Sequence, residues 1–422
     1  MKKKLMILLA AIASIVMVGS FSLIGCDREG VVAEEEVVVE EEEEEAEEEA
    51  VEEEEVETTG KFREVPLEWI LDLEEELAVP WTPGGPEDEP VLGAAQLELT
   101  AAQIAAAEDL ELGEYSFMAG TLDVTETLNK IGMDEVLASV GKEPIPFMGA
   151  GSISEQMDQV VGLVAKADDM SFLIAQAWDA VTLGPAFVEL SEAGVPQVHN
   201  WTTPVGLSDT ANYIGLVDAD GYGQGAAAAE ILAYAMDYEG EVGIIYFALE
   251  QWTNVMRLEG AEDTFAEYPD IEVVAREGFT DPAEGYDIAV GMLQANPEID
   301  AVWATWMMGP ATGAAEAVTA LGKVGEVIVA APDLGGITGA SFIADRDHPI
   351  IGCGAADCIV MGRNSIRAAF KWALGLEDEV GQGYFVSMTY PIVRANLVDG
   401  FYKQTAGTLG PLPRDVLDLL EE

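Results

Sequence analysis

The stretch Val242–Phe265, VGIIYFALEQWTNVMRLEGAEDTF, predicts a buried strand, a short loop and a helix. Its first part is an apolar run of β-branched and aromatic residues with the length of a strand. Thr253 or Asn254 can cap the helix that follows. Trp252 is then expected in the loop, and Arg257 about one turn into the helix. Because open α/β sheets bind ligands at the carboxyl ends of their strands, this loop is a candidate ligand site.

The same pattern of strand and helix repeats along the chain from Tyr115 onward. Strands are expected at 115–120, 145–150, 171–177, 195–200, 213–217, 242–247, 271–276, 300–305, 327–331, 349–353 and near 384–394. Helices are expected at about 124–139, 153–168, 182–193, 221–237, 253–267, 282–295, 310–322, 335–345 and 357–374. Regular alternation argues for parallel sheets wrapped by helices, and two sets of similar size argue for two lobes. The predicted fold class is therefore α/β with two lobes.

Residues 61–112 lack this alternation. Prolines break their middle at Pro80, Pro83, Pro86 and Pro90. Helices are expected only at Leu67–Leu77 and at Thr100–Leu110, the second capped by Thr100. We expect this N-terminal extension to pack on the first lobe.

Charge is the outlying feature of the composition, with 79 acidic and 19 basic residues and a net charge of −60. Residues 1–60 hold 19 of the acidic and four of the basic residues, so residues 61–422 still carry a net −45. A folded body with this charge repels nucleic acid and acidic membranes, and it repels itself unless salt screens it. We expect a protein that works in concentrated salt.

The first 24 residues begin with three lysines and continue as an apolar run, which suits an export signal or an N-terminal membrane helix. The sequence Leu23-Ile24-Gly25-Cys26 resembles a bacterial lipobox, in which the cysteine is lipidated and becomes the mature N-terminus. We expect a signal peptide at 1–25 and lipidation of Cys26; the alternative is an uncleaved helix with an incidental cysteine. In either case the body lies outside the cytoplasm and is tethered to a membrane.

Residues 26–60 contain a low-complexity acidic tract. Like charges four residues apart oppose a helix, and the composition favours a solvated, extended tether.

Signatures of catalysis and of nucleotide or metal binding are missing from the sequence. No GxGxxG opens a helix at the first strand, and no P-loop or GxSxG motif occurs. The Gly-rich run Gly221–Gly225 is better explained by a hinge or by close helix packing than by a phosphate cradle. His199 and His348 lie far apart without ligand spacing. We therefore expect no enzyme activity, no cofactor and no metal.

Cys353 and Cys358 can form a disulfide in an exported protein or remain buried thiols, and the spacing leaves both open.

Several short sequence motifs occur in a characteristic order along the folded part of the chain. They are Gln156–Val161 (QMDQVV), Phe187–Val198 (FVELSEAGVPQV), Tyr213–Asp218 (YIGLVD), Arg257–Gly260 with Tyr268–Asp270 (RLEG and YPD), Ala301–Trp306 with Gly313–Ala317 (AVWATW and GAAEA), Ala331–Asp333 (APD) and Asn396–Asp399 (NLVD). In this order and spacing they resemble the type I periplasmic binding proteins, in the ribose-binding-like branch that serves sugar ABC transporters. The resemblance covers about residues 100–405.

The resemblance implies two Rossmann-like lobes that are joined by three crossings, with a ligand in the cleft between them. It places Arg257 and Asp333 where the family binds sugar hydroxyls, and Asp357 near a polar contact at the second crossing. The boundaries that follow are 113–218 with 357–392 for the first lobe, and 219–356 with 393–422 for the second.

The chain departs from the family pattern at two positions. Trp201 replaces the aspartate that usually ends the fourth strand, and Met307 stands where an aspartate or asparagine follows the fifth-strand aromatic residue. The predicted cleft is therefore more aromatic, with Trp201, Trp252, Trp306 and Trp178 as candidates. Aromatic faces can cover the C–H faces of a sugar ring or surround a quaternary amine. Arg257 argues against a cation, because it adds a like charge.

The expected function is that of a lipid-anchored, monomeric binding protein that delivers a small ligand, most favourably a sugar, to the permease of an ABC importer. Two alternatives remain: the same fold with a nucleoside, autoinducer or zwitterion as ligand, and a sensory role in which the ligand is presented to a receptor. A secreted hydrolase is a third, which a close carboxylate pair in an open cleft would favour.

The charge of the body leads to a first prediction. Dialysis of the protein from molar to millimolar salt is expected to lower its thermal unfolding temperature, because the repulsion among its carboxylates is then less screened. Thermal melts across a salt series measure this, and an unfolding temperature that does not depend on salt would contradict it.

Overall fold

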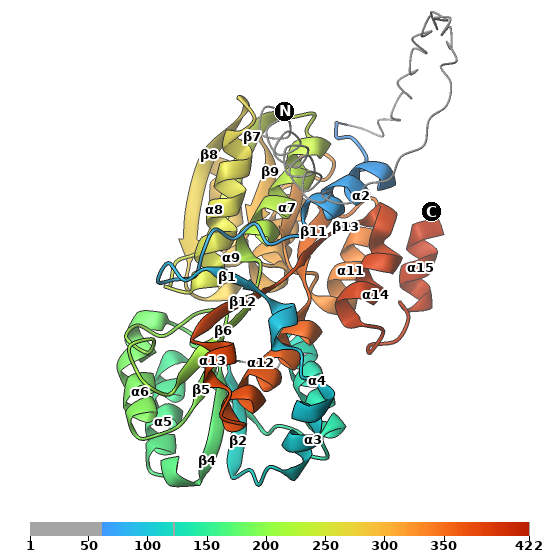
Figure 1. The fold of residues 1–422 in the computed structure, drawn as a ribbon. Helices are drawn as coiled ribbons and strands as arrows, with labels where there is room; N and C mark the ends of the chain where they lie inside the picture. Colours follow the sequence, from blue (N-terminus) through green and yellow to red (C-terminus); the bar gives the residue numbers. More distant parts are fainter. Residues whose placement is uncertain (1–60, 121–122, 422) are drawn as a thin grey trace, which may run out of the picture. The chain divides into compact units, whose positions relative to one another are not determined.

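The computed structural model describes residues 61–120 and 123–421. They form two sheets of mostly parallel strands with helices packed against them (Figure 1). The predicted α/β class with two sheets is confirmed.

The first sheet has the strand order β1-β12-β6-β5-β4-β2-β3 within the described residues, and all its pairs are parallel. Its strands are β1 (Val91–Gly93), β2 (Glu114–Ala119), β3 (Phe147–Gly149), β4 (Met170–Ala175), β5 (Gln197–Asn200), β6 (Tyr213–Ala219) and β12 (Gly383–Ser387). Strands β5, β6 and β12 are buried along their whole length, which explains why β6 and β12 are largely apolar without alternation. This sheet and its helices are the first lobe.

The second sheet has the order β13-β11-β10-β9-β7-β8, in which only the β11–β13 pair is antiparallel among the described strands. Its strands are β7 (Glu239–Phe247), β8 (Asp270–Phe279), β9 (Ile299–Ala304), β10 (Ile328–Pro332), β11 (Ile350–Ala356) and β13 (Thr389–Val393). This sheet and its helices are the second lobe.

Helices follow almost every strand, as the alternation predicted. Those before or on the first lobe are α2 (Leu67–Glu76), η1 (Ala94–Leu97), α3 (Ala101–Asp109), α4 (Val124–Ser139), α5 (Ile153–Val164), η2 (Ala167–Asp169), α6 (Ala180–Glu192), α12 (Cys358–Ala373) and α13 (Glu377–Val380). The others are α7 (Gly221–Ala235), α8 (Trp252–Ala266), η3 (Pro282–Glu284), α9 (Gly285–Ala295), η4 (Met307–Ala311), α10 (Thr312–Ala320), α11 (Gly336–Ala344), η5 (Arg394–Asn396), α14 (Leu397–Thr405) and α15 (Arg414–Glu421). The predicted cap of α3 by Thr100 is confirmed, and the structure adds Gln103 as its partner in a capping box.

The chain passes from one sheet to the other after β6, after β11 and between β12 and β13. The strand expected near 384–394 is in fact two strands, which Met388 separates and which belong to different sheets. The change of sheet lies four residues before the boundary expected after residue 392. A continuous apolar run shows that a segment is extended and buried, but it does not show which strands it pairs with.

The N-terminal extension packs on the first lobe, as expected, and in addition on the second. Strand β1 adds to the edge of the first sheet beside β12, and Leu97 joins the core of the first lobe. Helix α2, in contrast, lies beside α7 and β13 of the second lobe (Figure 1). It buries Ile70 and Leu73 there against Ala227 and Val393. The apolar stripe of α2 is equally suited to either lobe, so only the tertiary structure decides between them.

Helices α7 and α8 approach each other closely because glycines face each other. A β-carbon at Gly225 would clash with the carbonyl of Arg257, and one at Gly260 would clash with the carbonyl of Tyr222. The interpretation of Gly221–Gly225 as a close-packing segment is confirmed, and this packing fixes the position of Arg257 beside the hinge.

Three other expectations concern the two cysteines, a membrane-spanning helix and a metal site. Cys353 and Cys358 are both buried free thiols, so of the two alternatives the structure has the reduced one. Among the described residues, no helix is long and apolar enough to cross a membrane, and no group of acidic, histidine or cysteine side chains could hold a metal ion. The apolar N-terminal run and Cys26 lie outside the described residues.

The docking of α2 can be tested with two residues of the same helix. Ile70 is fully buried and Leu71 is about half exposed. Ile70→Ala is expected to lower the free energy of unfolding by about 2–5 kcal/mol, because it leaves a cavity in the core. Leu71→Ala is the matched control and should change it by less than about 0.5 kcal/mol. Urea unfolding measures both, and equal losses would contradict the docked face of α2.

Candidate ligand-binding site

A cavity of about 310 Å³ lies where the two sheets present the carboxyl ends of their strands. This volume is at the small end of the range for ligand pockets, which is about 300–1,000 Å³. Its lining residues are Gly120, Asp123, Thr125, Glu126, Gln176, Trp178, Trp201, Phe247, Gln251, Asn254, Arg257, Pro282, Trp306, Met308 and Asp333. Five of the seven ligand-binding candidates from the sequence line it: Arg257, Asp333, Trp306, Trp201 and Trp178.

The guanidinium of Arg257 is buried and held by several acceptors. Its Nε donates to Oε1 of Gln224 at 3.1 Å, and Nη1 donates to Oδ1 of Asn254 at 3.2 Å. The guanidinium carbon lies 5.5 Å from the centre of the Trp201 ring, within the range of a cation–π contact. Burial lowers the pKa of Arg257, and the charge of Asp333 opposes this. Arg257 is therefore a cation fixed at the cavity wall, and part of its hydrogen-bonding capacity is already used by the protein.

Asp333 follows β10 with a left-handed backbone conformation, at φ +57°. Its amide donates to the carbonyl of Gly354 at 2.8 Å, which holds this turn against β11. Burial raises the pKa of Asp333 to about 7, against the lowering effect of Arg257. Near neutral pH this carboxyl group can thus both donate and accept hydrogen bonds.

Glu126 was not predicted from the sequence, although it is almost fully buried at the cavity. It lies in the first turn of α4, where Oδ1 of Asp123 caps the helix by accepting from Thr125 N at 2.8 Å. Burial, the neighbouring Asp123 and, across the cavity, Asp333 raise the pKa of Glu126 well above its usual value. The signal that could have found Glu126 is its place in the first turn of the helix that follows β2, at the carboxyl edge of the sheet.

Aromatic side chains form the apolar walls. Trp306 packs edge-on against Phe247, with ring centres 5.1 Å apart, and its Nε1 donates to the carbonyl of Met308 at 2.9 Å. Trp178 donates from Nε1 to the carbonyl of Ala150 at 2.9 Å. Both rings are therefore held in place at the cavity wall.

Trp201 is only 4% exposed, and its Nε1 has no acceptor among the described residues. It takes a positive φ of 66° directly after β5. A tryptophan in this conformation is strained, and its free indole N–H is a donor that a bound solute could satisfy.

Trp252 and Asp357 do not line the cavity. Trp252 is the first residue of α8 rather than part of the loop, and neither Thr253 nor Asn254 caps this helix. Its ring packs against Leu216 and Tyr384, and Nε1 donates to the Tyr384 hydroxyl at 3.3 Å.

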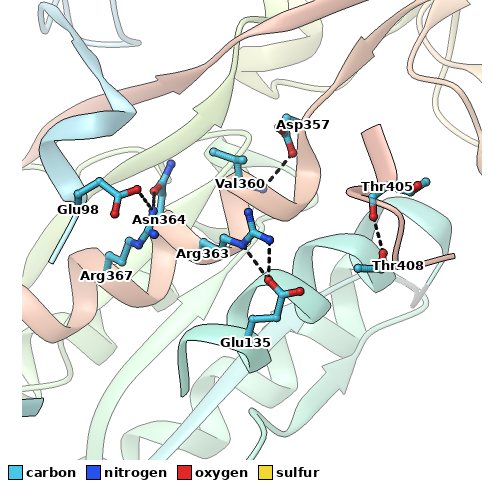
Figure 2. A network of polar contacts seen from close by, with 9 residues as sticks. All are labelled: Glu98, Glu135, Asp357, Val360, Arg363, Asn364, Arg367, Thr405 and Thr408. Atoms are coloured by element: carbon cyan, nitrogen blue, oxygen red, sulfur yellow. Dashed lines mark hydrogen bonds and ion pairs between the residues drawn. The ribbon is translucent and has the colours of Figure 1, made fainter. Parts of the chain in front are cut away.

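Asp357 instead caps α12, where Oδ1 accepts from the Val360 amide at 3.0 Å (Figure 2). The same view shows Arg363 of α12 paired with Glu135 of α4, which ties the helix after the second crossing to the first lobe.

Met307, the second departure from the family pattern, is fully buried in the core of the second lobe. Its neighbour Met308 lines the cavity instead. Position 307 therefore offers the cavity no polar group.

The lobes contact each other directly beside the cavity. The Ala180 amide donates to the carbonyl of Glu250 at 2.9 Å, and the Thr253 amide donates to the carbonyl of Trp201 at 3.0 Å. These hydrogen bonds join the first lobe to α8 and the loop before it. The structure therefore shows a closed arrangement of the lobes.

Residues 124–375 match the sequence profile of the family described as the periplasmic binding protein domain. The chain belongs to this family. Its members are extracytoplasmic binding proteins rather than enzymes.

Solved structures show the same fold. A solute-binding protein of an ABC transporter from Bacillus halodurans, with bound myo-inositol, is 24% identical, with 70% of this chain and 99% of that one covered and a TM-score of 0.58. A carbohydrate transporter solute-binding protein from Agrobacterium radiobacter, in complex with D-arabinose, is 21% identical over 69% and 97% of the chains, with a TM-score of 0.60. One from Actinobacillus succinogenes with D-allose is 20% identical over 68% and 100%, with a TM-score of 0.57. A sequence search of curated proteins finds no match.

The titration of Asp333 gives a prediction for stability. Between about pH 4 and 7 the folded protein holds a proton on Asp333 that the unfolded chain has released, so this group costs stability as pH rises through that range. Asp333→Asn is expected to flatten the fall in unfolding temperature between pH 4 and 7.

The matched control is Asp158→Asn, on the exposed face of α5, which should leave the pH dependence unchanged. Thermal melts across a pH series measure both variants, and an Asp333→Asn curve parallel to that of the unchanged protein would contradict the assignment.

Proposed function

We propose that this protein is an extracytoplasmic solute-binding lipoprotein that captures a small polyhydroxylated ligand, a sugar, and delivers it to an ABC importer. The observation that carries this proposal is the cavity between the sheets, in which aromatic faces and directional polar groups meet. In this proposal Trp178 and Trp306 cover the C–H side of a sugar ring, Trp201 donates its indole N–H, and Arg257 and Asp333 bind hydroxyls.

Both lobes supply polar groups to this cavity. Glu126 and Gln176 come from the first lobe, and Asn254, Arg257 and Asp333 come from the second. A ligand that bonds to both sets stabilises the closed arrangement, because the open one separates them. Solved relatives with bound myo-inositol, D-arabinose and D-allose support a sugar as the class of ligand.

The cellular place of the protein follows from its N-terminus. Lipidation of Cys26 would anchor the protein at the membrane surface, with residues 26–60 as the tether, and the folded body would dock as a monomer on the permease subunits. We also propose that the protein works in concentrated salt, because residues 61–422 carry a high negative charge. Lipidation is tested by labelling cells with a radioactive lipid precursor, and Cys26→Ser should abolish the label on this protein.

A second class of ligand is favoured by the charge of the cavity. Its lining residues include the carboxyl groups of Asp123, Glu126 and Asp333 but only one guanidinium, that of Arg257, which already has partners in the protein. A zwitterion or another ligand with an ammonium group would offset the excess of carboxyl groups and could lie against the aromatic faces. Presentation of the ligand to a receptor rather than a permease would use the same cavity.

A thermal-shift screen of monosaccharides, polyols, nucleosides and betaines in high salt tests the proposal. A solute at about 100 times its Kd should stabilise the protein by about 2.7 kcal/mol, seen as a rise in unfolding temperature of a few degrees. A sugar or polyol hit supports the main proposal, and a betaine hit without a sugar hit supports the second class. No hit in any class would contradict a solute-binding function.

Arg257 provides the mutational test of a sugar hit. Arg257→Ala is expected to weaken binding of that sugar roughly 30-fold or more, because a buried charged hydrogen-bond partner is removed. Arg276→Ala is the control, since Arg276 lies on β8 and pairs with Glu262 at the surface. Isothermal titration calorimetry measures both affinities, and unchanged affinity in Arg257→Ala would contradict the role of Arg257.

A further inference from the structure

The segment 78–90, here called the strap, runs from the second lobe to the first beside the hinge. At one end, α2 buries Ile70 and Leu73 on the second lobe, and Glu74 pairs with Lys403 at 2.6 Å. At the other end, β1 pairs with β12 of the first sheet, and the carbonyl of Gln96 accepts from Lys371 at 2.9 Å. The strap therefore has a firm attachment on each lobe.

The middle of the strap is bound to one buried carboxylate. The Trp81 amide donates to Oδ2 of Asp220 at 2.6 Å. The amide and the hydroxyl of Thr82 both donate to Oδ1, at 2.9 and 2.5 Å. Thr82 and Asp220 are both buried, so these are charge-assisted hydrogen bonds shielded from water.

Asp220 itself lies at the first crossing, between β6 and α7. Its amide donates to the carbonyl of Ser387 at 3.0 Å, and its carbonyl accepts from the Thr389 hydroxyl at 3.1 Å. Ser387 and Thr389 flank the crossing between β12 and β13. One residue thus ties the strap to two of the crossings on which the lobes turn.

Closure and opening of two-lobed proteins are rotations about a few residues at such crossings. An opening rotation moves the two attachments of the strap relative to each other. It therefore stretches the hydrogen bonds between the strap and Asp220. We propose that the strap is a fourth connection across the hinge, in which Thr82 acts as a positioning residue on Asp220 and favours the closed arrangement. This inference goes beyond the proposed function and holds whichever solute the cavity binds.

Native-state hydrogen exchange of the solute-free protein tests the strap. The amides of Ala180 and Thr253 donate across the cleft, so they exchange when the lobes separate. Thr82→Val keeps the volume of the side chain and removes the hydroxyl bond to Asp220. It is expected to speed exchange of these two amides roughly tenfold, as for loss of a hydrogen bond to a charged group. Amides in the interior of each sheet should not change.

Two variants serve as controls. Thr82→Ser restores the hydroxyl and should return exchange at Ala180 to that of the unchanged protein. Thr405→Val removes another buried hydroxyl, which donates to the carbonyl of Phe401 within α14, and should leave the exchange of Ala180 and Thr253 unaltered.

The proposal is overturned if Thr82→Val leaves the cross-cleft amides unchanged, or if it accelerates all amides of both lobes equally, which would mean a merely structural role. If Thr82→Val fails to fold, hydrogen exchange of the unchanged protein tests the proposal instead. Its Thr82 and Ala180 amides are expected to exchange with the same opening free energy. Faster exchange at Thr82 would show that the strap detaches without opening of the lobes and would contradict the proposal.

Discussion

Parallel pairing of strands determines where the cavity lies. Parallel strands require a crossover through a helix, so all their carboxyl ends meet at one edge of the sheet. Residues that follow β2, β4 and β5 line the cavity from the first lobe, and residues that follow β7, β9 and β10 line it from the second. The three crossings hold these two edges against each other, and almost every polar contact of the cavity follows from this constraint.

The position of Arg257 shows how packing away from the cavity controls its chemistry. Small residues let α7 and α8 touch along their backbones, and the guanidinium then reaches Gln224 of α7 as well as Asn254 of its own helix. A buried cation without partners would be costly, and the charges of Asp333 and Asp218 offset that cost. Asp218 is the next-to-last residue of β6, just before the first crossing, and its Oδ2 accepts from the Thr253 hydroxyl at 2.6 Å. The cation of the cavity is thereby coupled to the hinge.

The carboxyl groups of the cavity give closure an electrostatic component. Glu126 comes from the first lobe and Asp333 from the second, and each is raised in pKa by burial and by the nearness of other carboxyl groups. When the lobes approach, these groups either hold protons or gain a compensating partner. Protons, ligand hydroxyls that donate, and ligand cations all meet this need, so closure, ionisation and occupation of the cavity are linked processes.

The sequence by itself determined the order and type of most elements between residues 115 and 374, because strand and helix periods are local properties of the chain. It also placed Asp333, Trp178, Trp201 and Trp306 within a few residues of strand ends, and Arg257 in the helix after β7, at the edge where a parallel sheet gathers side chains. Only the tertiary structure decided which of these ends face the cavity. Trp252 packs on Tyr384, and Asp357 caps α12, because a side chain near a strand end can turn toward either side of the hinge. Likewise, the apolar stripe of α2 shows that the helix is buried but not which lobe buries it. The carboxylate of Asp220, which accepts the hydrogen bond from Thr82, is 138 residues away along the chain. Such pairings depend on contacts between distant segments, and no local pattern in the sequence records them.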